Sequence, residues 1–298
     1  MTRGPPKALT SPKPLPTPLA MSAAPNGPAA SPLPIRSSNL KHQRPKDKNN
    51  VEEKEPAPMI QPHPNPTFPK CKLRLICQDL DHAGANVFFS HNKPYTSISK
   101  AVDTVLSILY KPTKTNDHIP PTRSVSVTLR SMGGVAYTTG SDIDDDHKEI
   151  HFSLDYIRSI NSERQEEEIQ GVLVHEIVHC WQWNGIGTAP GGLIEGVADF
   201  VRLKAGLSPP HWKKENTGKW DAGYQHTGYF LEWIEHKWGD GSVRKVNNAL
   251  KDEEYKEEEF WEDLFGKKVE ELWNEYSEDL PKPKPKEEKV EPESVKQE

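Results

Sequence analysis

The stretch GVLVHEIVHCWQWNG (residues 171–185) decides more about this chain than any other part of it. Its two histidines, His175 and His179, are four residues apart. On an α-helix, side chains at this spacing project from one face a turn apart, close enough to bind one metal ion. Glu176 lies about 100° further round the helix, where it can reach a water molecule on that ion without binding the ion itself. The stretch predicts a helix with two metal ligands and a general base.

The residues around the histidines are strongly apolar: Val172, Leu173, Val174, Ile177 and Val178. Such a composition predicts a helix that is buried on most sides. Two histidines and a glutamate are costly there unless something pairs with them. A metal ion supplies that pairing, although a histidine pair can also be a packed, hydrogen-bonded feature of a core.

A catalytic zinc ion needs a third protein ligand and one open position for water. The loop NGIGTAPGG (184–192) is followed by GLIEGVADF (192–200), which contains Glu195. The glycines and Pro190 predict a reversal of the chain, so that a second helix starts beside the first and brings Glu195 to the histidines. We therefore predict Zn²⁺ as the cofactor, with His175, His179 and Glu195 as its ligands.

One turn after Glu195, Asp199 shares the same helix face. From there it can accept the free N–H of a ligating histidine, which fixes the tautomer and raises the basicity of the ring. Arg202 extends the same stripe. The alternative for Asp199 and Arg202 is a surface ion pair worth about a few tenths of a kcal/mol.

Charge is distributed unevenly along the 298 residues. Residues 1–70 contain ten Lys and Arg against four Asp and Glu, so they carry +6 and the remainder −12, against −6 overall. An acidic folded part repels phosphate backbones, and no Lys/Arg stripe with interleaved aromatics offsets it. No run of 18 or more apolar residues occurs. We expect neither a nucleic-acid nor a membrane partner.

Composition divides the chain into three parts. Residues 1–69 are rich in Pro, Ser, Ala, Lys and Asn, which predicts a disordered basic leader. Residues 281–298 alternate charge with proline, which predicts a disordered tail. Between them, residues 70–280 contain all eight tryptophans and are expected to form one domain.

Within this domain, period-two alternation predicts a strand over 72–80, and helical spacing of apolar residues predicts a helix over 97–110. Segments rich in Val, Thr and aromatics predict strands over 124–130, 134–140 and 149–154. The helices predicted after Asp155 span 165–183, 193–206, 221–238, 242–252 and 267–279. The expected fold is α+β: a small N-terminal mixed sheet with a helix, then a mainly helical half that carries the active-site helix.

Several uninterrupted blocks resemble the plant basic secretory protein family of HExxH peptidases, which also has fungal and bacterial members. The blocks are GVAYTTG (134–140), IHFSLDYI (150–157), HEIVHCWQWNG (175–185) and APGGLIEGVADFVRLKAG (189–206). The resemblance covers about residues 72–279 and depends on the order of the blocks as well as on HExxH. It implies a zincin-like metallopeptidase fold.

The same resemblance implies His175 and His179 as metal ligands and Glu176 as the catalytic residue. Glu195-Gly196 resembles the third-ligand helix of thermolysin-like and aminopeptidase-like enzymes, which indicates a gluzincin-like site. The longer pattern HExxHxxGxxH does not fit, because Gln182 and Gly185 occupy the positions of its glycine and third histidine.

A zinc peptidase also needs a hydrogen-bond donor for the negative charge that develops on the substrate. Residues 220–239 offer Tyr224, His226 and Tyr229. The Gly-Tyr pair that ends at Tyr224 matches the similar family, so the resemblance favours Tyr224 as a catalytic side chain. Aromatics at helical spacing, however, more often pack in a core.

Two features of the sequence bear on the cellular compartment of the protein. MTRGPPKALTSPKPLPTPLA (1–20) lacks the apolar core of a secretory signal, which favours an intracellular location, although similar proteins are secreted. Three cysteines, Cys71, Cys77 and Cys180, neither require nor exclude an oxidising compartment.

Together these features predict a monomeric zinc metallopeptidase that hydrolyses a peptide or protein substrate. Two alternatives stay open at this point: a zinc-stabilised binding protein without turnover, and a metallohydrolase that acts on a non-peptide amide or ester.

Overall fold

The computed structural model describes residues 67–281. Apart from 67–69 and 281, the predicted disordered leader (1–69) and tail (281–298) lie outside the described residues. Among the helices that are described, none is both long enough and apolar enough to cross a membrane.

A mixed sheet contains the strands β1 (Lys72–Cys77), β2 (Ser124–Arg130), β4 (His147–Ser153) and β3 (Ala136–Gly140), in that spatial order. The first three run parallel to one another, whereas β3 runs antiparallel to β4. The alternating apolar residues of β1 are half-buried, as their period-two pattern predicts. Both β1 and β3 are edge strands, and a cleft opens along β3.

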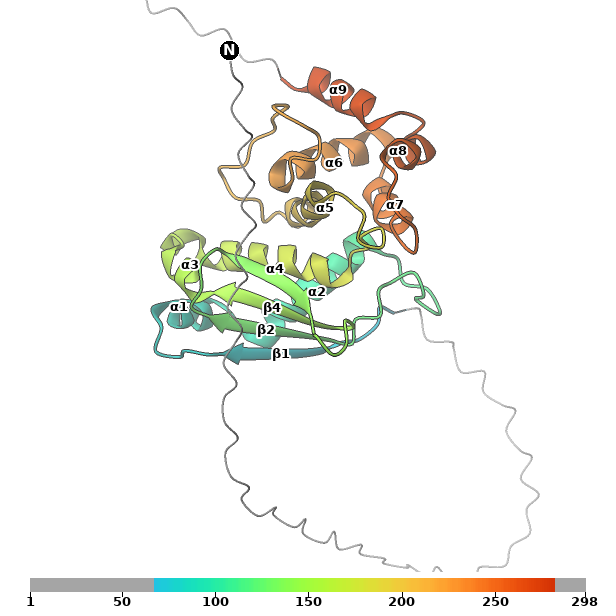
Figure 1. Ribbon diagram of the computed structural model, residues 1–298. Helices are drawn as coiled ribbons and strands as arrows, with labels where there is room; N and C mark the ends of the chain where they lie inside the picture. The colour runs from blue at the N-terminus through green and yellow to red at the C-terminus, as the bar shows by residue number, and fades with distance from the viewer. Residues whose placement is uncertain (1–66, 282–298) are drawn as a thin grey trace, which may run out of the picture. The chain divides into compact units, whose positions relative to one another are not determined.

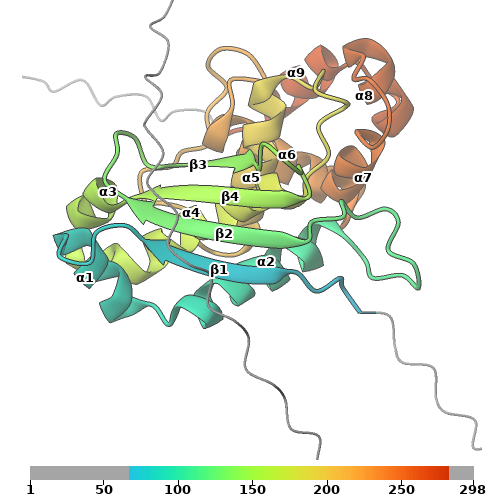
Figure 2. The same ribbon diagram turned by 60° about the horizontal axis from the view of Figure 1, so that its bottom comes forward.

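One face of the sheet is covered by α1 (Ala83–His91), α2 (Pro94–Leu109) and α4 (Gln165–Trp181) (Figure 2). The apolar face of α2 packs against α4 and β1. Pro94 occupies the first turn of α2, where its missing N–H leaves no hydrogen bond unmade. The HExxH helix α4 is therefore held between α2 and β3 and is buried along most of its length.

Helix α3 (Leu154–Ser159) follows β4 and packs against α1. The remaining helices extend from the other side of α4 (Figure 1). They are α5 (Gly191–Lys204), α6 (Tyr224–Trp238), α7 (Ser242–Ala249), α8 (Glu257–Phe265) and α9 (Val269–Asp279). Helix α5 packs on α4, and α6 packs on α5. Their close approach requires Gly196, because a Cβ there would lie 2.3 Å from the Thr227 side chain.

The helical half has an aromatic core of its own. Phe230 on α6 packs against Trp220, Trp261, Trp273 and Tyr276, with ring centroids 5.4 to 6.3 Å apart. Rings of this size bury a large apolar area per residue. Such packing accounts for the confinement of tryptophan to the second half of the sequence.

The α+β class and the mixed sheet are confirmed, and each predicted element has a counterpart. The strand predicted over 72–80 ends at Cys77, and the helix predicted from 221 begins at Tyr224, after Gly223 in a left-handed conformation (φ 84°). Helices α1, α3 and α8 were not predicted. They have nine residues or fewer, too short for a clear period, and α8 starts in an acidic run that is typical of loops.

The C-terminal end of α4 is anchored by two side chains from other elements. The hydroxyl of Tyr110 donates to the Trp181 carbonyl and accepts from Asn247 Nδ2 at 2.9 Å, and Thr122 Oγ1 donates to the Cys180 carbonyl at 2.6 Å. The last carbonyls of a helix have no partner within it. These contacts supply the partners and fix where α4 ends.

We expect Tyr110→Phe to destabilise the domain, because it leaves a buried carbonyl and a buried amide without their partner. The expected loss in the free energy of unfolding is about 1–3 kcal/mol, measured by urea denaturation. Tyr95→Phe, at an exposed tyrosine on α2, is the matched control. Equal stability of the two variants would contradict this anchoring role.

Candidate active site

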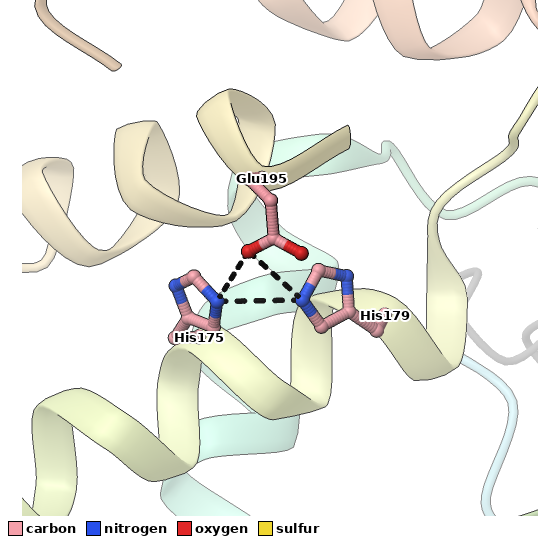
Figure 3. A group of neighbouring side chains, drawn as sticks. All are labelled: His175, His179 and Glu195. Carbon is pink, nitrogen blue, oxygen red and sulfur yellow. Dashed lines mark hydrogen bonds and ion pairs between the residues drawn. The ribbon is translucent and has the colours of Figure 1, made fainter. Parts of the chain in front are cut away.

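Three potential metal ligands from two helices meet above α4 (Figure 3). His175 Nε2 lies 3.3 Å from His179 Nε2 and 3.1 Å from Glu195 Oε2, and the third side of this triangle, from His179 Nε2 to Glu195 Oε2, measures 3.8 Å. Glu195 lies on α5 just after its first turn, because this helix begins at Gly191, two residues earlier than the sequence predicts. The structure therefore brings together the three residues that the sequence proposes as ligands.

Hydrogen bonds on the far side of each ring determine which nitrogen faces the site. His175 Nδ1 lies 2.7 Å from Asp199 Oδ1, so this nitrogen donates. His179 Nδ1 lies 3.1 Å from Gln182 Oε1. The amide of Gln182 is oriented by its Nε2, which donates to the Ile194 carbonyl at 3.1 Å, so His179 Nδ1 also donates. Both Nε2 atoms are thus left to face Glu195.

With both rings neutral, two Nε2 lone pairs and a carboxylate oxygen converge, which is unfavourable without a cation among them. Burial lowers the pKa of His175, but its hydrogen bonds to Asp199 and Glu195 outweigh burial and raise it to about 9. Burial and the neighbouring His175 lower the pKa of His179 to about 4. The site can therefore hold its cation as a proton on His175 or as a metal ion that replaces that proton.

Glu176 lies beside these ligands and is not one of them. Its carboxylate, in a residue only 6% exposed, accepts from Thr138 Oγ1 at 2.7 Å. Thr138 is on β3, so the edge strand holds this carboxylate in place. Burial raises the pKa of Glu176, which makes the carboxylate a stronger base than an exposed one.

Tyr224 lines the same cavity at the start of α6. Its ring lies parallel to that of His175 with centroids 6.4 Å apart, and 58% of the residue is exposed. The negative charge of Glu195 and partial burial raise its pKa, so the phenol stays protonated and can donate. Its φ of 50° is unusual for a bulky residue, and such strain is found preferentially at functional sites.

The two rival donors point elsewhere. His226 Nε2 contacts the Thr217 carbonyl at 2.6 Å, and Tyr229 packs against Trp212 and Lys214. Neither lines the cavity that contains the histidines.

The ion-pair partner of Arg202 is not the one that its position on α5 suggests. Arg202 is buried and pairs with Glu168 of α4 at 2.9 Å, rather than forming a surface pair with Asp199. Cys180 is buried, with its thiol 3.7 Å from the Glu176 carbonyl oxygen, and it takes no part in the ligand group.

The ligand group opens into a cavity of about 810 Å³. Its rim includes Val135, Ala136, Tyr137 and Thr138 on the β3 side. A volume of this size is in the range of pockets that hold a ligand of drug size or a short peptide segment.

Sequence reasoning missed two residues of the site, Thr138 and Gln182. Gln182 was noted only as a departure from a longer zinc pattern, although its position three residues after His179 permits the observed contact. Thr138 is 38 positions from Glu176, and only the strand order brings the two together.

Comparison with known protein families assigns this chain to a family. Residues 70–276 match the model of a family described as BSP, peptidase of plants and bacteria. Neither the curated proteins nor the solved structures gave a match. The matched region contains the whole ligand group, Glu176 and Tyr224, and on this match the chain belongs to the BSP family of peptidases of plants and bacteria.

Proposed function

We propose that this chain is a zinc-dependent peptidase in which His175, His179 and Glu195 hold the metal. The observation that carries the proposal is the convergence of three lone pairs from α4 and α5 within a cleft, with a buried carboxylate beside them. The site, together with the mixed sheet and its active-site helix, also leads us to propose a zincin-like, gluzincin-type fold.

The donor set fits zinc in chemistry and in spacing. Imidazole nitrogen and carboxylate oxygen bind zinc at about 2.0–2.2 Å, which places neighbouring ligands of a tetrahedron about 3.3–3.5 Å apart. The three separations here are 3.1, 3.3 and 3.8 Å. Three protein ligands leave one position for water, as catalytic zinc sites do.

When bound, zinc supplies Lewis-acid chemistry: it makes water acidic near neutral pH and polarises a carbonyl group. Glu176 takes the proton of the attacking water and later delivers it to the leaving amine. Thr138 keeps the Glu176 carboxylate oriented between these two transfers. The phenol of Tyr224 donates to the carbonyl oxygen of the substrate as that oxygen gains negative charge.

The free edge of β3 offers a way to align the substrate. The bonds from Ser153 N to Val135 O and from Ser141 N to His147 O show that odd-numbered residues of this strand pair with β4. In an antiparallel ladder the intervening residues direct their backbone groups outward. Ala136 and Thr138 thus present N–H and C=O groups towards the cleft, where an extended peptide can add as a further strand.

The proposed partner is therefore a peptide or protein substrate, and we propose that the chain acts as a monomer without nucleic acid. A zinc-stabilised binding protein would need the same ligands but not a buried Glu176 held by Thr138. Hydrolysis of a non-peptide amide or ester would not need the exposed backbone of β3. Both features favour the peptidase.

Glu176→Gln should abolish peptide hydrolysis without disturbing zinc, because the amide keeps the shape but cannot accept the proton. We expect kcat to fall by about 10²- to 10⁴-fold on peptide substrates, with zinc content and thermal stability unchanged. Glu167→Gln, at an exposed position of the same helix, is the control. Undiminished turnover in Glu176→Gln would rule out this general base.

Asp199→Asn should weaken zinc binding, because a neutral amide supports the His175 tautomer less strongly than a carboxylate. Zinc affinity, measured by competition with a chelating dye, should fall by about 10- to 100-fold. Asp240→Asn makes the same change of charge at an exposed residue and should leave the affinity unaltered. An unaltered affinity in Asp199→Asn would show that this hydrogen bond does not serve the metal.

Ala136→Pro should raise KM for peptides by about 3- to 10-fold, the equivalent of one hydrogen bond, because it removes an outward N–H. The ladder with β4 does not use that N–H, so the melting temperature should change little. Ala136→Gly keeps the N–H and serves as the control. A KM equal to that of the control would argue against strand addition.

A further inference from the structure

The cavity extends beyond the ligand group along α4. Val172 and Glu168 come three and seven residues before His175, so they lie about 4.5 and 10.5 Å further along the helix axis. Across from them is the segment that follows α5. We call this part of the cavity the distal arm. Its lining consists of Tyr156, Glu168, Val172, Arg202, Pro209 and Trp212.

Arg202 determines the shape of the distal arm. Its guanidinium lies directly against α4 at Gly171, where a Cβ would be 2.7 Å from Arg202 Nε. The same Nε donates to the Leu207 carbonyl at 3.0 Å, and the ring of Trp212 lies 5.3 Å from Cζ. Arg202 thus ties the segment after α5 to α4 and holds Trp212 in the cavity that Val172 also lines.

The charges at the floor of the arm are already paired. Arg202 Nη2 donates to Glu168 Oε1 at 2.9 Å, and the Tyr156 hydroxyl donates to the same oxygen at 2.8 Å. Burial raises the pKa of Glu168, but the charge of Arg202 and the hydrogen bonds from Arg202 and Tyr156 together outweigh burial, so the net shift is downward. Arg202 and Glu168 therefore form an ion pair in which each residue is less than 10% exposed.

A charged substrate side chain would lose water in the arm without gaining an unpaired counter-ion. The remaining walls are apolar: Val172, Pro209 and the half-buried ring of Trp212. An aromatic or branched aliphatic group gains from burial against such walls. His211 also lines the cavity but is exposed, so its ring stays in contact with water.

We infer that the distal arm is a specificity subsite for a large, uncharged side chain of the substrate, aromatic or branched aliphatic, close to the bond that is cleaved. The inference rests on the proposed peptidase function and names its substrate class. Trp212 supplies the contact surface, and Arg202 acts as a positioning residue that keeps this surface in place.

The test measures peptide binding to the zinc-loaded full chain carrying Glu176→Gln, so that no peptide is consumed. Acetyl-tetraalanine amide is titrated calorimetrically beside versions in which one position in turn is Phe, Leu, Asp or Lys. We expect Phe and Leu at one position to bind about ten-fold tighter than Ala, and Asp and Lys to bind no tighter than Ala. Adding Trp212→Ala should remove the difference, and Trp212→Phe should retain most of it.

Tyr95→Ala, which removes an exposed aromatic ring outside the cavity, should leave the preference intact. Three results would overturn the inference: no peptide binding, a preference for Asp or Lys, or a preference for Phe that survives Trp212→Ala. Cleavage by the chain with Glu176 intact is assayed in parallel. Selective, Trp212-dependent binding without cleavage would reject the peptidase and keep the subsite.

Discussion

The burial of three acceptor atoms against one another is the constraint on which the rest of the structure depends. Two imidazole Nε2 atoms and an oxygen of Glu195 lie within a few ångströms of one another, on a buried His175 and a half-buried His179 and Glu195. Their mutual repulsion falls only if a cation lies among them. Asp199 accepts from Nδ1 of His175, and Gln182 accepts from Nδ1 of His179. The lone pair of each ring is therefore on Nε2, which faces Glu195.

Packing around α4 positions the other residues of the site. The sheet and α2 bury α4, so its polar face is the one that opens to the cavity. Gly196 on α5 lets α6 approach, which brings Tyr224 into the cleft that contains the ligand group. The edge strand β3 contributes both the hydroxyl that orients Glu176 and the backbone that lines the cleft. Helix α4 thus meets Glu195 from α5, Tyr224 from α6 and Thr138 from β3, three separate elements.

Much of this could be predicted from the sequence because it is encoded locally. The spacing of His175 and His179 specifies a shared helix face, and a short loop constrains where Glu195 can go. The contact from Thr138 and the distal arm depend instead on strand order and on how a segment after α5 folds back, which no local period reveals. Arg202 illustrates what a sequence pattern leaves open. Its position on the same face of α5 as Asp199 follows from the spacing, but its ion pair with Glu168 does not. The guanidinium can approach α4 only because Gly171 has no side chain.

The central claim is that α4 and α5 bind zinc through two imidazoles and one carboxylate. X-ray absorption at the zinc edge, on the full chain loaded with an equimolar amount of zinc, tests it most directly. The account predicts nitrogen and oxygen neighbours at about 2.0–2.2 Å, a histidine signature from two rings, and loss of tight binding in Glu195→Ala. Sulfur neighbours at about 2.3 Å, or binding that is indifferent to Glu195, would contradict it.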